Sequence, residues 1–444
     1  MTTGQKIEAQ LDELDSVKDD FIDALEAKGV TGILPTDKYE KLVNDISKIR
    51  GVVYEKDVNF YNYDGELLYS YTKEEALALT SLPEGVSGSL YTFDEWNSTL
   101  SEIKRDIQSP INDKLYIGAL VKAKGANTII CITLTKAQLN FSLTILRSYA
   151  SGSIDWGDGT VDSYSTSSST TIKYHSYTKE GDYIIKVSGN GASDIASSMF
   201  SAKNSVTEIF LDGSNNARLR ENALSGLYNL RAIGGFKTIW STANSNVFDN
   251  SNLSTIIIPR TEDLYGCILH NSTSMAKLNL LSLPGNIIQV RKNAFNWMYN
   301  IKIHFPLSIE QYFGDNFYSN SMITKGRLPF DRSASYTNIF YNCSNLYYLE
   351  VVRTQSGGYK YNIGQNTIYN CLSLRTLYMV DATSAGYPNA IPGLQSGTLY
   401  NLPSTCQIVV RDASYNAFIN DSSWSAYSSQ IIKKSDWDAQ QNNS

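Results

Sequence analysis

Residues 340–351 read FYNCSNLYYLEV, and residues 368–379 repeat the phrase as IYNCLSLRTLYM. A third copy, FDNSNLSTIII, occupies residues 248–258. Each copy starts with an aromatic or aliphatic residue, reaches an Asn two positions later, and continues as Leu-x-x-Leu or Leu-x-x-Ile before a further apolar position. A unit of this size cannot bury its own apolar face and must stack on copies of itself. The pattern therefore predicts a solenoid.

The spacing of the units is that of leucine-rich repeats. Steps of 23, 22, 26, 22, 23 and 28 residues separate the first apolar anchors, and such repeats have a period of about 20 to 29 residues. Looser copies run through 224–233, 269–280 and 295–303. We expect the solenoid to occupy residues 200–434 and to end in a terminal unit at 412–427 that covers its open end. The anchors are Leu230, Leu253, Met275, Ile301, Ile323, Leu346 and Leu374.

Residues between the anchors of each repeat should point away from the core. These places hold Thr255 with Ile257, Lys277 with Asn279, Tyr348 with Glu350, and Thr376 with Tyr378, and they should form columns on one exposed sheet. Tyr beside polar groups suits sugar stacking or protein contact at low entropic cost. The alternative for any single Tyr is that it only covers the sheet. We predict a ligand-binding face made of Tyr348, Glu350, Arg353, Thr376 and Tyr378.

The composition excludes several classes of partner. Charged residues make up 18% of the chain, below the usual level of about 25%, and the 30 Tyr among many Ser, Thr and Asn predict a mainly β protein with a polar surface. A net charge of -6 with scattered Lys and Arg argues against nucleic acid as a ligand. No stretch reaches the roughly 18 apolar residues that membrane insertion requires.

The five cysteines give no sign of a metal or redox centre. They are odd in number, widely spaced and without a C-x-x-C pair, so neither zinc, nor a redox motif, nor a disulfide framework is indicated. Cys343 and Cys371 occupy the same position in two repeats. We expect both to be small buried residues beneath a turn.

Apolar residues recur with heptad spacing near the start of the chain. They lie 4, 3, 7 and 4 residues apart, as in a coiled-coil seam. A helix of three heptads has marginal stability alone. We therefore predict that residues 1–50 form either a helical hairpin that packs on itself or a homo-oligomeric stalk, for which we expect a trimer. In either form, this segment would attach the protein to a larger assembly. The seam residues are Ile7, Leu11, Leu14, Phe21 and Leu25.

Residues 51–124 predict a small α+β module. Alternating strands at 58–63 and 66–71 flank an Asp-Gly turn, which is a strong hairpin signal. Thr72 and Glu75 form a capping box that opens a helix. A second helix is expected near 98–107, followed by a strand near 115–121.

This module resembles the β-grasp-like repeat of internalins and other bacterial surface proteins. The likeness rests on the hairpin followed by Tyr91-x-Phe93-x-x-Trp96, with Glu95 in the place where that repeat usually has Gly. The resemblance implies a small α+β module of the β-grasp-like type. Such modules act as spacers in surface proteins.

The segment from 125 to 190 carries the most specific local motif. Residues 153–160 read SIDWGDGT and residues 174–187 read YHSYTKEGDYIIKV. Trp156 alternates into a core, while Gly157 and Gly159 supply turn conformations. The motif resembles the polycystic-kidney-disease (PKD) domain, and that resemblance implies an immunoglobulin-like β-sandwich used as a spacer or adhesive module.

Catalysis has no recognisable motif in this chain. The three histidines, His175, His270 and His304, lie outside any ligand or nucleophile pattern, and no Walker, H-E-x-x-H or G-x-S-x-G sequence occurs. Glu310 and Asp315 are a conceivable carboxylate pair without supporting context. We predict that the protein is not an enzyme and needs no cofactor.

Metal binding is not expected either. Asp155, Asp158 and Asp162 cluster around a turn, but their spacing is not that of an EF-hand loop, and Asp158-Gly159 is ordinary turn chemistry. Calcium at this turn stays open as the alternative. For the whole chain we predict no metal site.

The repeats resemble the divergent BspA-like leucine-rich repeats of bacterial surface proteins. The order of a helical start, an Asp-Gly hairpin module, a further β domain and such repeats also resembles structural proteins encoded by phages and prophages of gut bacteria. That resemblance implies a phage tail fibre or receptor-binding protein that contacts the host through its repeats. The alternatives are a head fibre or decoration protein, a bacterial cell-surface adhesin, and, with least support, an enzyme that degrades envelope polysaccharide.

The expected partners follow from this hypothesis. The first residues show no apolar leader or cleavage site, so we expect synthesis in the bacterial cytoplasm and a place on the exterior of the virion. The N-terminal helices would bind other virion proteins and join copies of the chain. The repeats would bind a host cell-surface glycan or protein, with a polar tail at 435–444.

Overall fold

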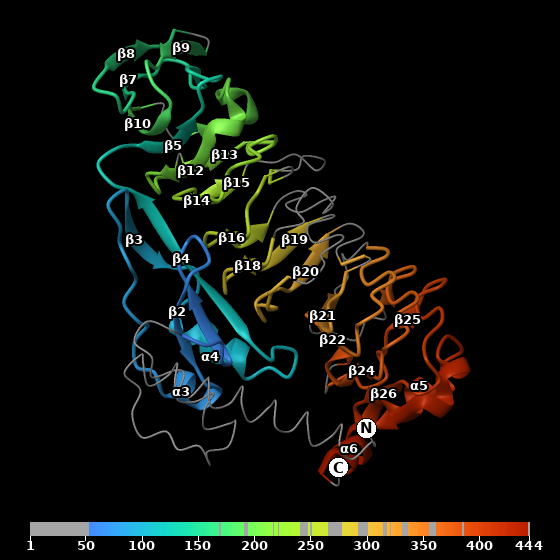
Figure 1. Cartoon of the computed structure of the whole chain (residues 1–444). Helices are drawn as coiled ribbons and strands as arrows, with labels where there is room; N and C mark the ends of the chain where they lie inside the picture. The colour runs from blue at the N-terminus through green and yellow to red at the C-terminus, as the bar shows by residue number, and fades with distance from the viewer. Residues whose placement is uncertain are drawn as a thin grey trace, which may run out of the picture.

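The computed structural model describes residues 53–167, 170–190, 194–215, 217–220, 222–239, 247–248, 251–264, 278–291, 301–313, 318–319, 321–330, 336–354, 361–383 and 386–442. In these ranges the protein is mainly β with few helices. A small module, a two-sheet region and a long solenoid follow one another along the chain (Figure 1). The helical segment predicted for residues 1–50, with its seam at Ile7, Leu11, Leu14, Phe21 and Leu25, lies outside the described residues.

The first described unit is a four-stranded mixed sheet with two helices, which we call the module. Its strand order is β2-β1-β4-β3, with β1 parallel to β4 in the centre and an antiparallel strand on each side. The predicted hairpin and the Thr72–Glu75 capping box are confirmed. The elements are β1 (Val58–Tyr61), β2 (Leu67–Tyr71), α3 (Lys73–Ala78), β3 (Tyr91–Trp96), α4 (Leu100–Ile107) and β4 (Leu115–Ala123).

Two facing sheets follow the module. Trp156 is fully buried between them, its ring stacks on that of His175 from β9 at 4.9 Å, and its carbonyl accepts a hydrogen bond from the Tyr177 hydroxyl at 2.9 Å. Gly157 and Gly159 have φ values of 81° and 93°, which L side chains rarely adopt. The predicted core position of Trp156 is thus confirmed, while the PKD family assignment stays a prediction. The strands are β5 (Thr128–Leu134), β6 (Asn140–Ile145), β7 (Ser151–Asp155), β8 (Val161–Ser165), β9 (Thr171–Ser176) and β10 (Gly181–Gly189).

The larger of these sheets continues into the solenoid. Its order is β14-β12-β5-β10-β7-β8. Strand β12 (Val206–Leu211) pairs antiparallel with β5 and parallel with β14 (Ala232–Gly234), the strand of the next coil. An uncovered first coil would expose apolar surface and unpaired strand groups. The two-sheet region therefore covers the N-terminal end of the solenoid.

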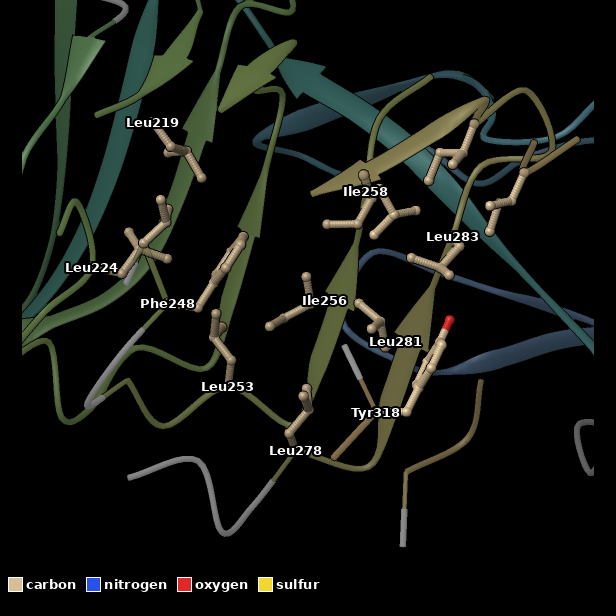
Figure 2. Packing of buried hydrophobic residues seen from close by; sticks show 14 of the residues in the cluster. Leu219, Leu224, Phe248, Leu253, Ile256, Ile258, Leu278, Leu281, Leu283 and Tyr318 are labelled. Atoms are coloured by element: carbon tan, nitrogen blue, oxygen red, sulfur yellow. The ribbon is translucent and has the colours of Figure 1, made fainter. Parts of the chain in front are cut away.

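The solenoid has parallel strands on two sides of its coils. Figure 2 shows the interior, where side chains from successive coils, such as Leu253, Ile256 and Leu281, lie beside one another. Of the described anchors, Leu230, Leu253, Leu346 and Leu374 have no exposed surface and Ile323 is 8% exposed, as predicted, whereas Ile301 is only half-buried. One side holds β16 (Thr255–Ile257), β18 (Leu280–Ser282), β21 (Lys325–Phe330), β22 (Tyr348–Arg353), β24 (Thr376–Tyr378), β26 (Gln407–Val410) and β27 (Ile431–Lys433). The other side holds β11 (Asp194–Ile195), β13 (Arg218–Leu219), β15 (Thr238–Ile239), β17 (Asp263–Leu264), β19 (Gln289–Arg291), β20 (Gln311–Phe313), β23 (Asn362–Ile363) and β25 (Gly393–Leu394).

The repeated Asn and Cys of the sequence motif have distinct structural roles. Asn342 and Asn370 adopt left-handed φ values of 57° and 58°, a conformation that Asn tolerates better than most residues. Cys343 and Cys371 are buried, and each thiol donates to a backbone carbonyl at 2.9 Å. Burial raises the pKa of Cys343 to about 12. The expectation of small buried cysteines is confirmed.

The C-terminal end of the solenoid is covered by short helices. Phe418 and Trp424 are fully buried there, and the Trp424 indole donates to the Pro392 carbonyl at 2.6 Å. This agrees with the expected terminal unit. The structure differs from the expected polar tail at 435–444, because the residues of this segment up to Asn442 form a helix. The helices are α5 (Tyr415–Asn420) and α6 (Lys434–Asn442), with 3-10 turns η5 (Asp412–Ser414) and η6 (Ser425–Gln430).

The module packs across the outward side of the first repeats. Asn97, which follows β3, is fully buried and donates to the Ser282 hydroxyl at 2.9 Å. Arg260 forms two hydrogen bonds with Glu102 of α4, at 2.8 and 2.9 Å. The side-chain amide of Asn112 donates to the Phe305 carbonyl and accepts from the Phe305 amide, both at 2.9 Å. Figure 1 shows β4 running from the module toward the two-sheet region.

This packing corrects the prediction of one continuous exposed sheet. Thr255 and Ile257 point outward from β16 but are only 5% and 7% exposed, because the module covers them. Asn279 is exposed, and Lys277 lies outside the described residues. The outward side is left uncovered by the module only in the later repeats.

Candidate ligand-binding face of the repeats

The candidate site is the outward side of β21, β22 and β24, which we call the open face. It lies between the module and helix α6. Strand register places Lys325, Tyr348 and Thr376 in one row, and Arg327, Glu350 and Tyr378 in the next. The alternation of outward and buried residues along β22 is the pattern of a strand with one face on a core.

Three aromatic rings gather on the open face. Tyr348 and Tyr378 stack with ring centroids 6.2 Å apart and planes 28° apart. Trp437 of α6 meets Tyr378 edge to face at 5.7 Å. The buried indole nitrogen of Trp437 has no hydrogen-bond partner within the described part of the chain. A buried Trp N–H usually finds a partner, so this donor differs from the indole nitrogens of Trp156 and Trp424, which are hydrogen-bonded.

An ion pair supports the aromatic rings from one side. Arg327 and Glu350 are 3.3 Å apart, and their side chains are only 14% and 12% exposed. Arg327 also donates to the carbonyls of Leu307 and Ile309 at 3.0 and 2.9 Å. Burial raises the pKa of Glu350, and Arg327 opposes that shift. This pair fixes the floor of the face and presents little area to solvent.

The structure brings together four of the five predicted site residues. Tyr348, Glu350, Thr376 and Tyr378 share the open face. Arg353 does not join them, since its guanidinium lies 4.7 Å from the ring centre of Tyr361 and donates to the Ala390 carbonyl at 3.3 Å. Arg353 is therefore directed away from the other four residues, and its role in ligand binding stays a prediction.

Two residues of the site were missed by the sequence prediction. Arg327 lies directly opposite Glu350 in the register. The available signal was its position four residues after the anchor Ile323, as Glu350 lies four residues after Leu346. Trp437 lies in a polar segment assigned to a tail. Trp437 is the only aromatic residue of 435–444, and this was the signal that could have pointed to it.

The other titratable candidates have structural partners. Asp158 accepts hydrogen bonds from Thr160 and His175 at 2.6 and 2.8 Å, and Asp162 accepts from the Trp156 indole at 2.9 Å. His304 is fully buried. Asp315 and His270 lie outside the described residues. The residues that the structure describes hold no group of three His, Cys, Asp or Glu arranged to bind a metal.

Comparison with known proteins identifies the repeats. Residues 164–276 and 268–391 match the model of the BspA type leucine-rich repeat region, with six copies. These spans together exceed half of the chain, so the protein belongs to the BspA-type leucine-rich repeat family. A search of curated proteins gives no match.

A similar solved structure is a leucine-rich repeat protein from Bacteroides ovatus. It shares 17% identity over 51% of this chain and 75% of that chain, with a TM-score of 0.32. In the described part of the chain, no helix is long and apolar enough to cross a membrane.

Proposed function

We propose that this protein is a non-enzymatic adhesive protein that binds a cell-surface glycan or protein through the open face. The observation that carries the proposal is the group of three rings, Tyr348, Tyr378 and Trp437, beside the Arg327–Glu350 pair. Tyr and Trp supply rigid contact area with a polar end. Two of the rings come from neighbouring coils and the third from the separate helix α6.

The solenoid suits an adhesive role because both of its ends are covered. The two-sheet region pairs with the first coil, and the terminal helices pack on the last. Such ends prevent edge-to-edge growth, so the side of the coils is the surface for specific contacts. Repeat proteins commonly bind ligands on an extended surface of this kind.

The experiment compares two pairs of stacked tyrosines. Tyr348→Ala with Tyr378→Ala should reduce binding to target cells by about tenfold or more, a loss of roughly 1.4 kcal/mol. The matched control is Tyr341→Ala with Tyr369→Ala, a pair stacked at 4.7 Å in the turns of the same repeats. Equal adhesion of the two double variants would place the contact elsewhere.

We further propose that a phage particle carries the protein on its exterior, most directly as a tail fibre. The support is the resemblance of the module order to phage-encoded structural proteins, with residues 1–50 as the attachment and trimerisation segment. Mass spectrometry of purified particles should detect the chain. If the chain is absent from particles and present on the bacterial surface, it is a protein of the bacterium, and the adhesive role is unchanged.

A further inference from the structure

A groove lies where the module meets the repeats, beside the open face. Its volume is about 320 Å³. Small-ligand sites have volumes of about 300 Å³ and above, so the groove is large enough for a small ligand. The turn before β4 forms one wall, and the segments 301–305 and 322–325 form the other. The groove exists only because the module is docked on the solenoid.

Three lysines from three segments line this groove. Lys114 comes from the module, Lys302 from one coil and Lys325 from the next. Lys302 pairs with Glu55 and lies 5.9 Å from the ring centre of Tyr61. Lys114 reaches the same Glu55 carboxylate at 3.5 Å, so two ammonium groups share one acid.

The remaining acid of the groove is more weakly held. Asp113 pairs with Lys325 at 2.6 Å, but its side chain is 68% exposed, so solvent screens its charge. Burial disfavours ionised Glu55, but hydrogen bonds from Lys302 and Tyr61 outweigh that effect and lower the pKa of Glu55. Three cations against two carboxylates leave one positive charge, in a chain whose net charge is -6. A monoanion matches this balance better than a dianionic phosphate does.

The lining also offers apolar surface for the body of a ligand. Ile301 and Ile303 are half-buried, and Met322 is 39% exposed. Such surface suits the C–H face of a sugar ring, while lysine ammonium groups suit its carboxylate. Lys325 pairs in register with Tyr348, so the groove adjoins the aromatic rings of the open face.

We propose that this groove binds the carboxylate of an acidic sugar residue within the same glycan chain that the open face contacts. This inference rests on the proposed function and names its ligand class as an acidic oligosaccharide. Lys114 and Lys302 contact the carboxylate, because they share Glu55 and are more exposed than Lys325. The sugar ring lies on the apolar lining.

The test measures the affinity of the full chain for an oligogalacturonate and for its methyl ester by calorimetry. The acid should bind about tenfold more tightly than the ester. Lys114→Gln with Lys302→Gln should abolish that difference. Glu55→Gln, which removes a competing acid, should enlarge it. Lys122→Gln is the matched control, since Lys122 pairs with Asp94 at 2.8 Å outside the groove.

The outcomes separate this inference from the proposed function. If acid and ester bind with equal affinity and the Tyr348/Tyr378 double variant binds neither, the groove inference is overturned and the adhesive role of the open face is retained. An acid preference that persists in the lysine double variant would also overturn it. Binding of neither ligand would overturn the groove inference alone, because the open face is tested separately by the adhesion of the Tyr348/Tyr378 double variant to target cells.

Discussion

Gly118 of β4 lies directly over Ile257 of β16. A Cβ built on Gly118 would come within 2.5 Å of the Ile257 side chain, closer than real atoms approach. Two segments far apart in sequence therefore meet without space for one methyl group. This contact is central to the docking of the module on the repeats, and several predictions depend on that docking.

Replacing Gly118 with Ala should loosen the module. The added methyl group must displace Ile257, and overpacking of this kind costs about 1–3 kcal/mol. Thermal unfolding should shift downward. Ile257→Ala in the same chain should recover part of the loss, because it opens the space that the methyl group needs. Additive losses in the double variant would show that the two residues are not in contact.

Acidification should weaken the same interface through His304. Burial, with a smaller contribution from Arg105, lowers the pKa of His304 from 6.5 to about 3, and its Nδ1 accepts a hydrogen bond from the Tyr116 amide at 3.3 Å. The unfolded chain thus binds a proton that the folded chain excludes. The contribution of His304 to stability is complete above pH 6.5 and falls as the pH drops toward 3.

His304→Asn is the variant that isolates this effect, since its amide oxygen can still accept from Tyr116 without titrating. Chemical denaturation between pH 4 and 7 should show a shallower loss of stability for the variant than for the wild type, by up to about 1.4 kcal/mol per pH unit. Parallel pH profiles would mean that His304 is not the group responsible.

Removing Trp424 should open the C-terminal end of the solenoid. The side chain is fully buried and hydrogen-bonded, and truncating a buried Trp to Ala costs about 3–5 kcal/mol. Trp437→Ala is the comparison, because Trp437 is only half-buried and should cost much less. Hydrogen exchange over 407–433 would report the difference. Similar protection in both variants would argue against a capping role for Trp424.

The repeated Asn can be tested by two substitutions at one position. Asn370 has a φ of 58°, and its amide donates to Asn342 at 2.9 Å. Asn370→Ala should cost about 1–2 kcal/mol through the left-handed backbone alone, whereas Asn370→Gly should cost less because Gly adopts that conformation freely. Equal losses measured by denaturant titration would assign the whole effect to the lost hydrogen bond.

The sequence predicts those features that depend on local pattern. The phrase around Asn342 and Asn370 predicts the coils because each repeat needs the same turn, apolar anchor and strand. Thr72 with Glu75 predicts a helix start because both partners of the capping box lie within one turn. Trp156 predicts a core position from strand alternation.

Features that depend on distant contacts could not be predicted in this way. Asn97 reads as an ordinary polar residue, yet it binds Ser282, far along the chain. The module thereby buries Ile257, which the strand pattern alone places in solvent. Trp437 joins the site from a helix that carries no repeat motif, so no periodicity could align it with Tyr378.

Hydroxyl-radical footprinting of the chain bound to target-cell envelope glycan shows whether the open face is the binding surface. We expect protection of Tyr348, Tyr378 and Trp437, with no change at the turn tyrosines Tyr341, Tyr369 and Tyr400, which stack on one another. Protection of the turn tyrosines, or of exposed Tyr174 in the two-sheet region, with an unchanged open face, would contradict it.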